Sequence, residues 1–140
     1  MKSLTEFKDR FLNLNESTLD EIISYYDKNV FFKDPFNEFN GREKLKKIFI
    51  HMFITLKNPH FVFIDTIENS EGIFLTWDLN FSYKEKLFKI HGSSHLKLND
   101  EKKIVYHRDY WDVGEELLLK IPLIKSLYGF FQNKLALSFN

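Results

Sequence analysis

The chain has 140 residues, a length that suits one compact domain with a real core. Basic and acidic residues number 20 each, so the formal net charge is zero. This balance argues against binding nucleic acid through phosphate neutralisation and against attraction to an anionic membrane. The sequence has no cysteine, which excludes disulfides, thiolate metal sites and a cysteine nucleophile.

The N-terminal part of the sequence predicts two helices. Ser3 and Glu6 have the spacing of a capping box, which predicts a helix over about residues 3–13. Ser17 is placed to cap a second helix. Its apolar stripe recurs at helical intervals, at Leu19, Ile22, Ile23 and Tyr26.

A short strand, a loop and a third helix are expected next. Residues 30–32 are apolar, and the strand that they predict ends at Asp34 because Pro35 has no N–H to donate to a sheet. Residues 35–41 have turn chemistry and predict a loop. Residues 42–56 repeat apolar side chains with the period of a helix.

After Pro59 the hydrophobic period changes to two, which predicts strands. The expected strands are residues 60–68, 73–83, 87–98 and 104–112. Helices followed by an antiparallel meander predict an α+β fold, in a single domain over residues 1–140.

The C-terminal extension, residues 114–137, is expected to be helical and bent at Pro122. It is too apolar for a solvent-facing tail. We expect it to cover the open end of the domain as a lid over an apolar ligand. The alternative is that it lies on a membrane surface, although it is too interrupted by charge and proline to insert stably. The polar N-terminus does not resemble a secretory signal, so a cytoplasmic protein is expected.

The order of these features resembles the nuclear transport factor 2-like superfamily. A strand ends in Asp34-Pro35, Gly41 follows seven residues later, and a helix leads to a meander that ends in Tyr110-Trp111. The sequence is similar to the ketosteroid isomerases and the SnoaL-like polyketide cyclases. The resemblance implies a cone-shaped, curved antiparallel sheet packed on N-terminal helices, with an apolar pocket inside the cone and assembly as a homodimer.

The resemblance also suggests site residues. The general base of the ketosteroid isomerases falls on Asp34, and an acidic residue of the polyketide cyclases and of limonene epoxide hydrolase falls on Asp109. The two oxyanion donors of the isomerases fall near Arg10-Phe11 and on Ser94, where neither a tyrosine nor an aspartate stands. An aspartate before a proline also commonly caps a turn, which is the alternative role for Asp34.

His107, Asp109 and Trp111 alternate along the last expected strand and therefore project to one face. If that face lines the pocket, His107 and Asp109 form an acid–base couple between the walls Trp77 and Trp111. Alternation alone leaves open the reverse arrangement, with the face of Tyr106 turned inward.

Two functions remain open from the sequence. The first is an enzyme that binds a small apolar, carbonyl-bearing molecule and moves a proton or adds water without a metal or cofactor. Its expected catalytic residues are Asp34, His107 and Asp109, and its expected ligand-binding residues are Phe36, Trp77, Ser94 and Trp111. The second is a non-catalytic module that binds a lipid-like ligand or a protein partner.

The outer face of the expected sheet suits a twofold contact between two copies of the chain. It mixes polar and aromatic residues, namely Asp78, Asn80, His91, His95, Tyr106 and Tyr110. The two histidines, His91 and His95, have no matched carboxylate, so a metal site is not expected there.

Overall fold

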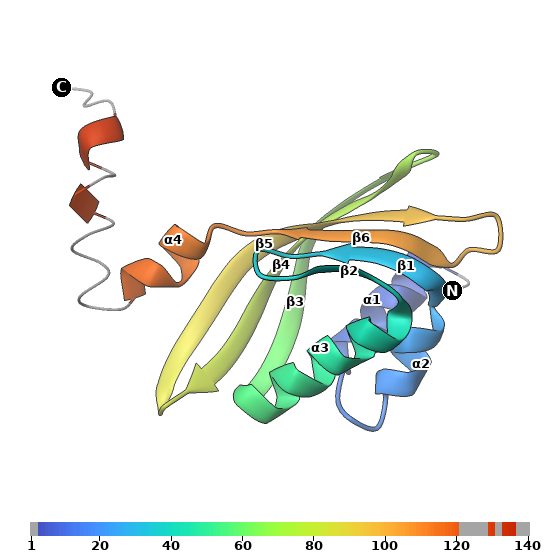
Figure 1. Cartoon of the computed structure of the whole chain (residues 1–140), viewed down its shortest axis with the longest axis horizontal. Helices are drawn as coiled ribbons and strands as arrows, with labels where there is room; N and C mark the ends of the chain where they lie inside the picture. The colour runs from blue at the N-terminus through green and yellow to red at the C-terminus, as the bar shows by residue number, and fades with distance from the viewer. Residues whose placement is uncertain (1–2, 121–128, 131–132, 137–140) are drawn as a thin grey trace.

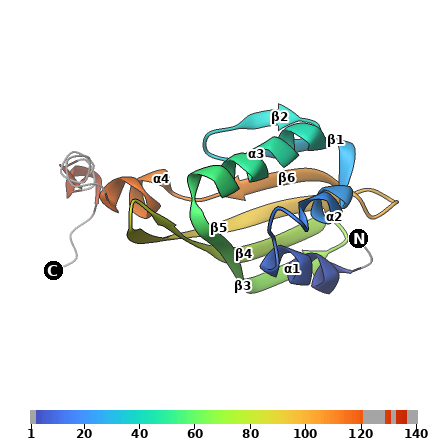
Figure 2. The same cartoon turned by 90° about the horizontal axis from the view of Figure 1, so that it is seen from below.

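A curved sheet carries three helices on its concave face (Figures 1 and 2). The computed structural model describes residues 3–120, 129–130 and 133–136. The fold is α+β, as predicted, and the sheet has six strands in the order β2-β1-β6-β5-β4-β3. Neighbouring strands are antiparallel except β1 and β6, which run parallel.

The helices are α1 (Leu4–Leu12), α2 (Leu19–Ser24), α3 (Arg42–Thr55), α4 (Val113–Glu116) and the 3-10 turn η1 (Leu118–Lys120). The strands are β1 (Tyr26–Lys33), β2 (Glu38–Asn40), β3 (Lys57–Asn69), β4 (Gly72–Tyr83), β5 (Lys86–Leu98) and β6 (Ile104–Tyr110).

The predicted cap of the first helix is confirmed, whereas the predicted cap of the second helix is wrong. Ser3 accepts a hydrogen bond from the backbone N–H of Glu6 at 3.1 Å. In the second helix Thr18, not Ser17, stands at the N-cap position. The reason is that Asn15 Oδ1 accepts hydrogen bonds from both the N–H and the hydroxyl of Ser17, so that this residue belongs to the preceding turn.

The first strand begins four residues earlier than predicted. Tyr26, expected on the apolar stripe of the second helix, opens β1 and pairs with Ile104 at the start of β6. The helix has already ended at Tyr25, whose N–H donates to the carbonyl of Ile22. The helical spacing of apolar residues therefore extends to Tyr26, although pairing of this residue with β6 ends the helix before it. The displacement matters because it brings the Tyr26 side chain into the site.

Three other boundaries differ from the predictions. The expected loop 35–41 contains β2, which pairs back on β1 with Phe39 opposite Phe32. Strand β3 starts at Lys57, because Pro59 lies at a register shift on this edge strand, where a missing N–H is tolerated. Strand β6 ends at Tyr110, two residues earlier than expected.

The inner faces of β4 and β5 follow the predicted alternation. On β4 the buried residues are Ile73, Leu75, Trp77, Leu79 and Phe81. On β5 they are Ile90, Gly92, Ser94 and Leu96. These faces and the buried sides of α1, α2 and α3 form one apolar core.

Two side chains of the C-terminal elements cover the edge of β5 beyond the end of β6. Glu116 accepts a hydrogen bond from the N–H of His91 at 3.0 Å, and Lys120 donates one to the carbonyl of Lys89. These contacts satisfy backbone groups that an uncovered edge strand would leave open. The expected bend at Pro122 and residues 121–128, 131–132 and 137 of the expected lid lie outside the described residues. Within the part of the chain that the structure describes, no helix is long and apolar enough to span a membrane.

An aromatic row crosses the convex face of the sheet. The ring of Phe74 stacks on His95 at 4.6 Å, His95 meets the edge of Tyr106 at 5.2 Å, and Tyr106 stacks on Phe31 at 5.3 Å. Ile67, opposite Phe74, extends this row, which we call the convex row, to β3. Burial lowers the pKa of His95, and the neighbouring charge of Lys97 lowers it further.

The shifted pKa of His95 predicts a loss of stability in acid. The unfolded chain binds a proton at the ordinary histidine pKa of 6.5, whereas folded His95 resists protonation, so stability falls as the pH drops below that value. We expect His95→Phe to keep the stack on Phe74 and to reduce the decrease in Tm between pH 7.5 and pH 5. His60→Phe, at an exposed histidine, is the control and should keep the wild-type decrease. Equal decreases in H95F and wild type would contradict this account.

Candidate functional site

A cavity of about 820 Å³ lies between the helices and the concave face of the sheet. Its described lining comes mainly from α1, α3, β1 and strands β3 to β6, and nine of these described lining residues are phenylalanines. These are Phe7, Phe11, Phe32, Phe36, Phe49, Phe61, Phe63, Phe81 and Phe88. The phenylalanine surplus of the sequence therefore supplies much of the cavity wall, and the space fits a small apolar molecule.

A chain of hydrogen bonds forms the polar part of the wall. The hydroxyl of Tyr26 lies 3.0 Å from His107 Nδ1, and His107 Nε2 lies 2.8 Å from Asp109 Oδ1. The same oxygen accepts from the hydroxyl of Ser94 at 2.5 Å. Ser94 Oγ in turn accepts from the indole N–H of Trp77 at 2.8 Å. Five side chains from β1, β4, β5 and β6 are thus joined in one network.

The buried end of this network assigns its hydrogens. Burial raises the pKa of Tyr26 well above its ordinary value of 10.0, and the charge of Asp109 raises it further, so the phenol keeps its proton. Its O–H then donates to His107 Nδ1, and Nε2–H donates to Asp109. In this arrangement every polar hydrogen of the three groups has an acceptor, as burial requires. This assignment places the proton of His107 on Nε2 and makes Nδ1 the acceptor.

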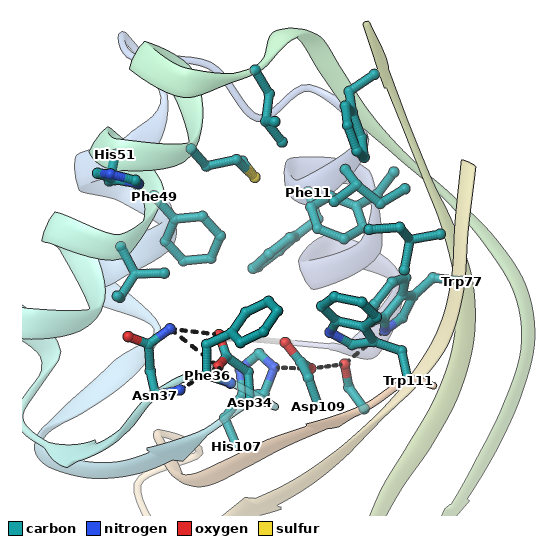
Figure 3. A pocket seen from close by; sticks show the side chains of 18 of the residues that line it. Phe11, Asp34, Phe36, Asn37, Phe49, His51, Trp77, His107, Asp109 and Trp111 are labelled. Carbon is teal, nitrogen blue, oxygen red and sulfur yellow. Dashed lines mark hydrogen bonds and ion pairs between the residues drawn. The ribbon is translucent and has the colours of Figure 1, made fainter. Parts of the chain in front are cut away.

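Asp109 presents one oxygen to the cavity. Oδ1 accepts both of its hydrogen bonds, whereas Oδ2 has no donor among the described residues. Figure 3 shows the second oxygen pointing toward the cavity, beside the labelled rings of Phe36 and Trp111. The side chain is 20% exposed, which leaves it accessible from the cavity. A carboxylate fixed through one oxygen and free at the other can accept a proton from a bound molecule.

Asp34 also lines the cavity, but its carboxylate stabilises a turn. Asp34 Oδ1 accepts from the N–H groups of Phe36 and Asn37 at 2.7 and 2.6 Å. The side-chain amide of Asn37 donates to the same carboxylate at 3.1 Å. This is the turn-capping arrangement expected as the alternative role of Asp34. The turn also places Phe36 against Trp111, with ring centroids 5.5 Å apart.

The structure brings together all seven residues expected at the site. Asp34, Phe36, Trp77, Ser94, His107, Asp109 and Trp111 line the same cavity. The orientation that alternation left open is thus the one with His107, Asp109 and Trp111 facing inward. Their roles in binding or catalysis stay predictions.

Two residues of the site, Tyr26 and Asn37, were not identified from the sequence. Tyr26 was hidden because it continues the helical spacing of Ile22 and Ile23, and only its pairing with β6 places it next to His107. Asn37 was passed over as a loop residue. An asparagine three residues after an aspartate was the available signal for a capped turn.

No cluster of three or more metal-ligating side chains occurs among the residues that the structure describes. On the convex face His91 Nδ1 lies 2.8 Å from Asp78 Oδ1, but the histidine is more than half exposed and the other neighbour of the carboxylate is a cation, Lys89 at 3.7 Å. His95 packs instead between Phe74 and Tyr106.

The comparisons agree with the fold. Residues 8–107 match the family model of the SnoaL-like domain. The chain belongs to this family. No curated protein matches the sequence.

Solved structures show the same fold at low sequence identity. An NTF2-like protein of unknown function from Exiguobacterium sp. 255-15 is 19% identical, with a TM-score of 0.67 over 76% of this chain and 98% of that one. A protein with a ketosteroid isomerase-like fold from Catenulispora acidiphila DSM 44928, in complex with trimethylamine, is 12% identical, with a TM-score of 0.71 over 82% and 92%. An LEH-like epoxide hydrolase from M. tuberculosis is 13% identical, with a TM-score of 0.68 over 87% and 93%.

The close packing of Gly92 against Trp77 gives a test of the cavity wall. A Cβ at Gly92 would lie 2.5 Å from the Trp77 ring, so the indole that donates to Ser94 would have to move. We expect Gly92→Ala to lower the free energy of unfolding by about 1–3 kcal/mol, the usual effect of overpacking. Urea denaturation measures this change. Gly129→Ala, where nothing lies within 4 Å, is the control and should have little effect. A G92A protein as stable as wild type would contradict the wall geometry.

Proposed function

We propose that the protein is an enzyme that binds a small apolar carbonyl compound in its cavity and transfers a proton with Asp109 as the base, in the cytoplasm and without a metal or cofactor. The observation that carries this proposal is the free oxygen of Asp109, held at an apolar wall by a buried network. A carboxylate oxygen in apolar surroundings has few other hydrogen-bond donors near it, so a bound molecule can supply its proton. The family membership supports a small-molecule site, and one structural neighbour is an epoxide hydrolase.

Asp109 is a better base than Asp34. Both oxygens of Asp34 accept hydrogen bonds from the turn at residues 34–37, so neither oxygen is left for a bound molecule. Only one oxygen of Asp109 is engaged within the described residues. The proposal therefore assigns proton transfer to Asp109 and a structural role to Asp34.

His107 positions the base in this proposal. Its Nε2–H fixes Oδ1 of Asp109, and its Nδ1 is fixed by Tyr26 on the neighbouring strand. Phe32 packs its edge against the imidazole at 5.1 Å, which further limits movement of the ring. A base held in this way needs little reorganisation when it takes a proton.

The second candidate function is ligand binding without turnover. The specific observation in its favour is that the two oxyanion donors of the isomerases fall near Arg10-Phe11 and on Ser94, and Ser94 donates its hydroxyl to Asp109. In this case the cavity would hold a lipid-like molecule and Asp109 would only orient it. The two functions differ in whether a bound ketone loses a proton.

Exchange of carbon-bound protons tests the proposed chemistry. We expect the wild-type protein in D₂O to catalyse exchange of the protons next to the carbonyl of 2-tetralone, as followed by NMR. Asp109→Asn should slow this exchange by at least about 100-fold, because it removes the base. Asp34→Asn is the matched control, and its rate should stay within about threefold of wild type. Binding of the ketone with no exchange above the buffer rate would favour the non-catalytic module.

We propose in addition that the protein forms a homodimer through the convex face of its sheet. The convex row includes Ile67, whose surface is 72% exposed, and Phe74, which is 43% exposed. Polar groups flank the row, among them the Asp78–His91 pair. A face that combines an apolar centre with polar surroundings suits a self-complementary twofold contact.

Disruption of the convex row tests the dimer. We expect the wild-type mass at tens of micromolar to correspond to two chains in sedimentation equilibrium. Phe74→Lys should shift it to one chain, because a charge would be buried at the contact. Ile54→Lys, at a 77% exposed position on α3, is the control and should leave the dimer intact. A wild-type mass of one chain would rule the interface out.

A further inference from the structure

The cavity has few side-chain hydrogen-bond donors left for a ligand. Trp77 donates to Ser94, Ser94 and His107 donate to Asp109, and Asn37 donates to Asp34. The other polar donors among the described lining residues belong to exposed side chains, namely Lys47, His51, Thr55 and Tyr83. The network that fixes the base therefore leaves no oxyanion donor of its own.

The indole N–H of Trp111 is the exception. Trp111 lines the cavity, is half-buried, and its N–H has no hydrogen-bond acceptor within the described part of the chain. The edge-on contact with Phe36 holds the ring in place, with an interplanar angle of 77°. Figure 3 shows the indole on the side of the cavity where Asp109 presents its free oxygen.

Asp109 and Trp111 form a complementary pair. They are two residues apart and both face the cavity, so their backbone positions are separated by roughly 6.6 Å along an extended chain. One offers a free acceptor and the other a free donor, and they do not bond to each other. A carbonyl oxygen and a hydrogen on the adjacent carbon can reach two such groups at the same time.

We propose that the indole N–H of Trp111 is the oxyanion donor of this site and that the ligand is an apolar ketone with an acidic hydrogen beside its carbonyl. This inference rests on the proposed function and adds a catalytic residue to it. Asp109 Oδ2 takes the proton from the carbon next to the carbonyl. The C–H electron pair becomes the carbon–carbon double bond of an enolate, and the negative charge moves to the oxygen, which accepts from Trp111. Return of a proton from Asp109 to carbon completes the step.

The position explains how the site works without the donors of the ketosteroid isomerases. Ser94 stands where the resemblance places a donating aspartate, but its hydroxyl is used to fix Asp109. The proposed donor in this chain is instead Trp111, which follows the base Asp109 by two residues. Because the indole cannot lose its proton at ordinary pH, it donates in every protonation state of the base.

The affinity ratio of two matched probes tests the donor. We compare 2-tetralone with tetralin, the hydrocarbon of nearly the same shape, by calorimetric titration. Wild-type protein should bind the ketone at least about fivefold more tightly, the effect of one added hydrogen bond. Trp111→Phe keeps an aromatic ring but loses the N–H, so the ratio should fall to about one while tetralin affinity stays within about twofold. Tyr110→Phe, at a 41% exposed residue that does not line this cavity, removes one polar hydrogen next to Trp111 in the sequence and should keep the wild-type ratio.

Exchange kinetics on the same probe distinguish this inference from the function on which it rests. W111F should slow proton exchange of 2-tetralone by about 100-fold, the effect of losing one oxyanion donor. D109N should slow exchange by at least about 100-fold but keep a preference for the ketone over tetralin. If the wild type exchanges and W111F matches it in both rate and affinity ratio, Trp111 is not the donor and the proposed function stands. If the wild type neither exchanges nor prefers the ketone, both proposals are wrong.

Discussion

The hydrogen bond between the Tyr26 hydroxyl and His107 Nδ1 is the interaction on which the candidate site depends. It is buried, and it joins the start of β1 to the middle of β6 across the parallel pair of the sheet. Because the phenol keeps its proton and needs an acceptor, the imidazole must turn its other N–H to Asp109. One buried donor thus sets the tautomer of His107. The Nε2–H of His107 and the hydroxyl of Ser94 then both engage Oδ1 of Asp109, and Oδ2 is left for a ligand.

The rest of the fold supports this geometry. The curvature of the sheet and the phenylalanines of α1, α3 and β3 enclose the space into which Asp109 projects. The turn at Asp34 brings Phe36 against Trp111, and Gly92 leaves room for the Trp77 ring that donates to Ser94. The candidate site and the apolar core therefore share residues: the cavity wall is also part of the core.

Much of the fold and of the site could be predicted from the sequence. Alternation along β4 and β5 assigned their inner faces correctly, because one side of each strand is uniformly apolar or small. Strand alternation and the resemblance to the nuclear transport factor 2-like superfamily together selected seven residues that the structure places around one cavity. Alternation could not orient β6, since both of its faces mix aromatic and polar groups.

The rest depended on contacts that are distant in the sequence. Tyr26 lies 81 positions from His107, and local apolar spacing assigned it to a helix that tertiary pairing ends earlier. The short strand β2 exists because the Asp34 turn returns the chain to β1, which a pattern of turn residues does not indicate. The free oxygen of Asp109 was likewise beyond sequence reasoning, because it follows from which donors are already used.

The tautomer of His107 tests the central claim most directly. Nitrogen NMR on ¹⁵N-labelled protein at pH 7.5 distinguishes a protonated from an unprotonated ring nitrogen. The account predicts a neutral ring with its proton on Nε2 and an unprotonated Nδ1 that accepts a hydrogen bond. A proton on Nδ1, alone or together with one on Nε2, would mean that Tyr26 does not set the network, and the orientation assigned to Asp109 would be wrong.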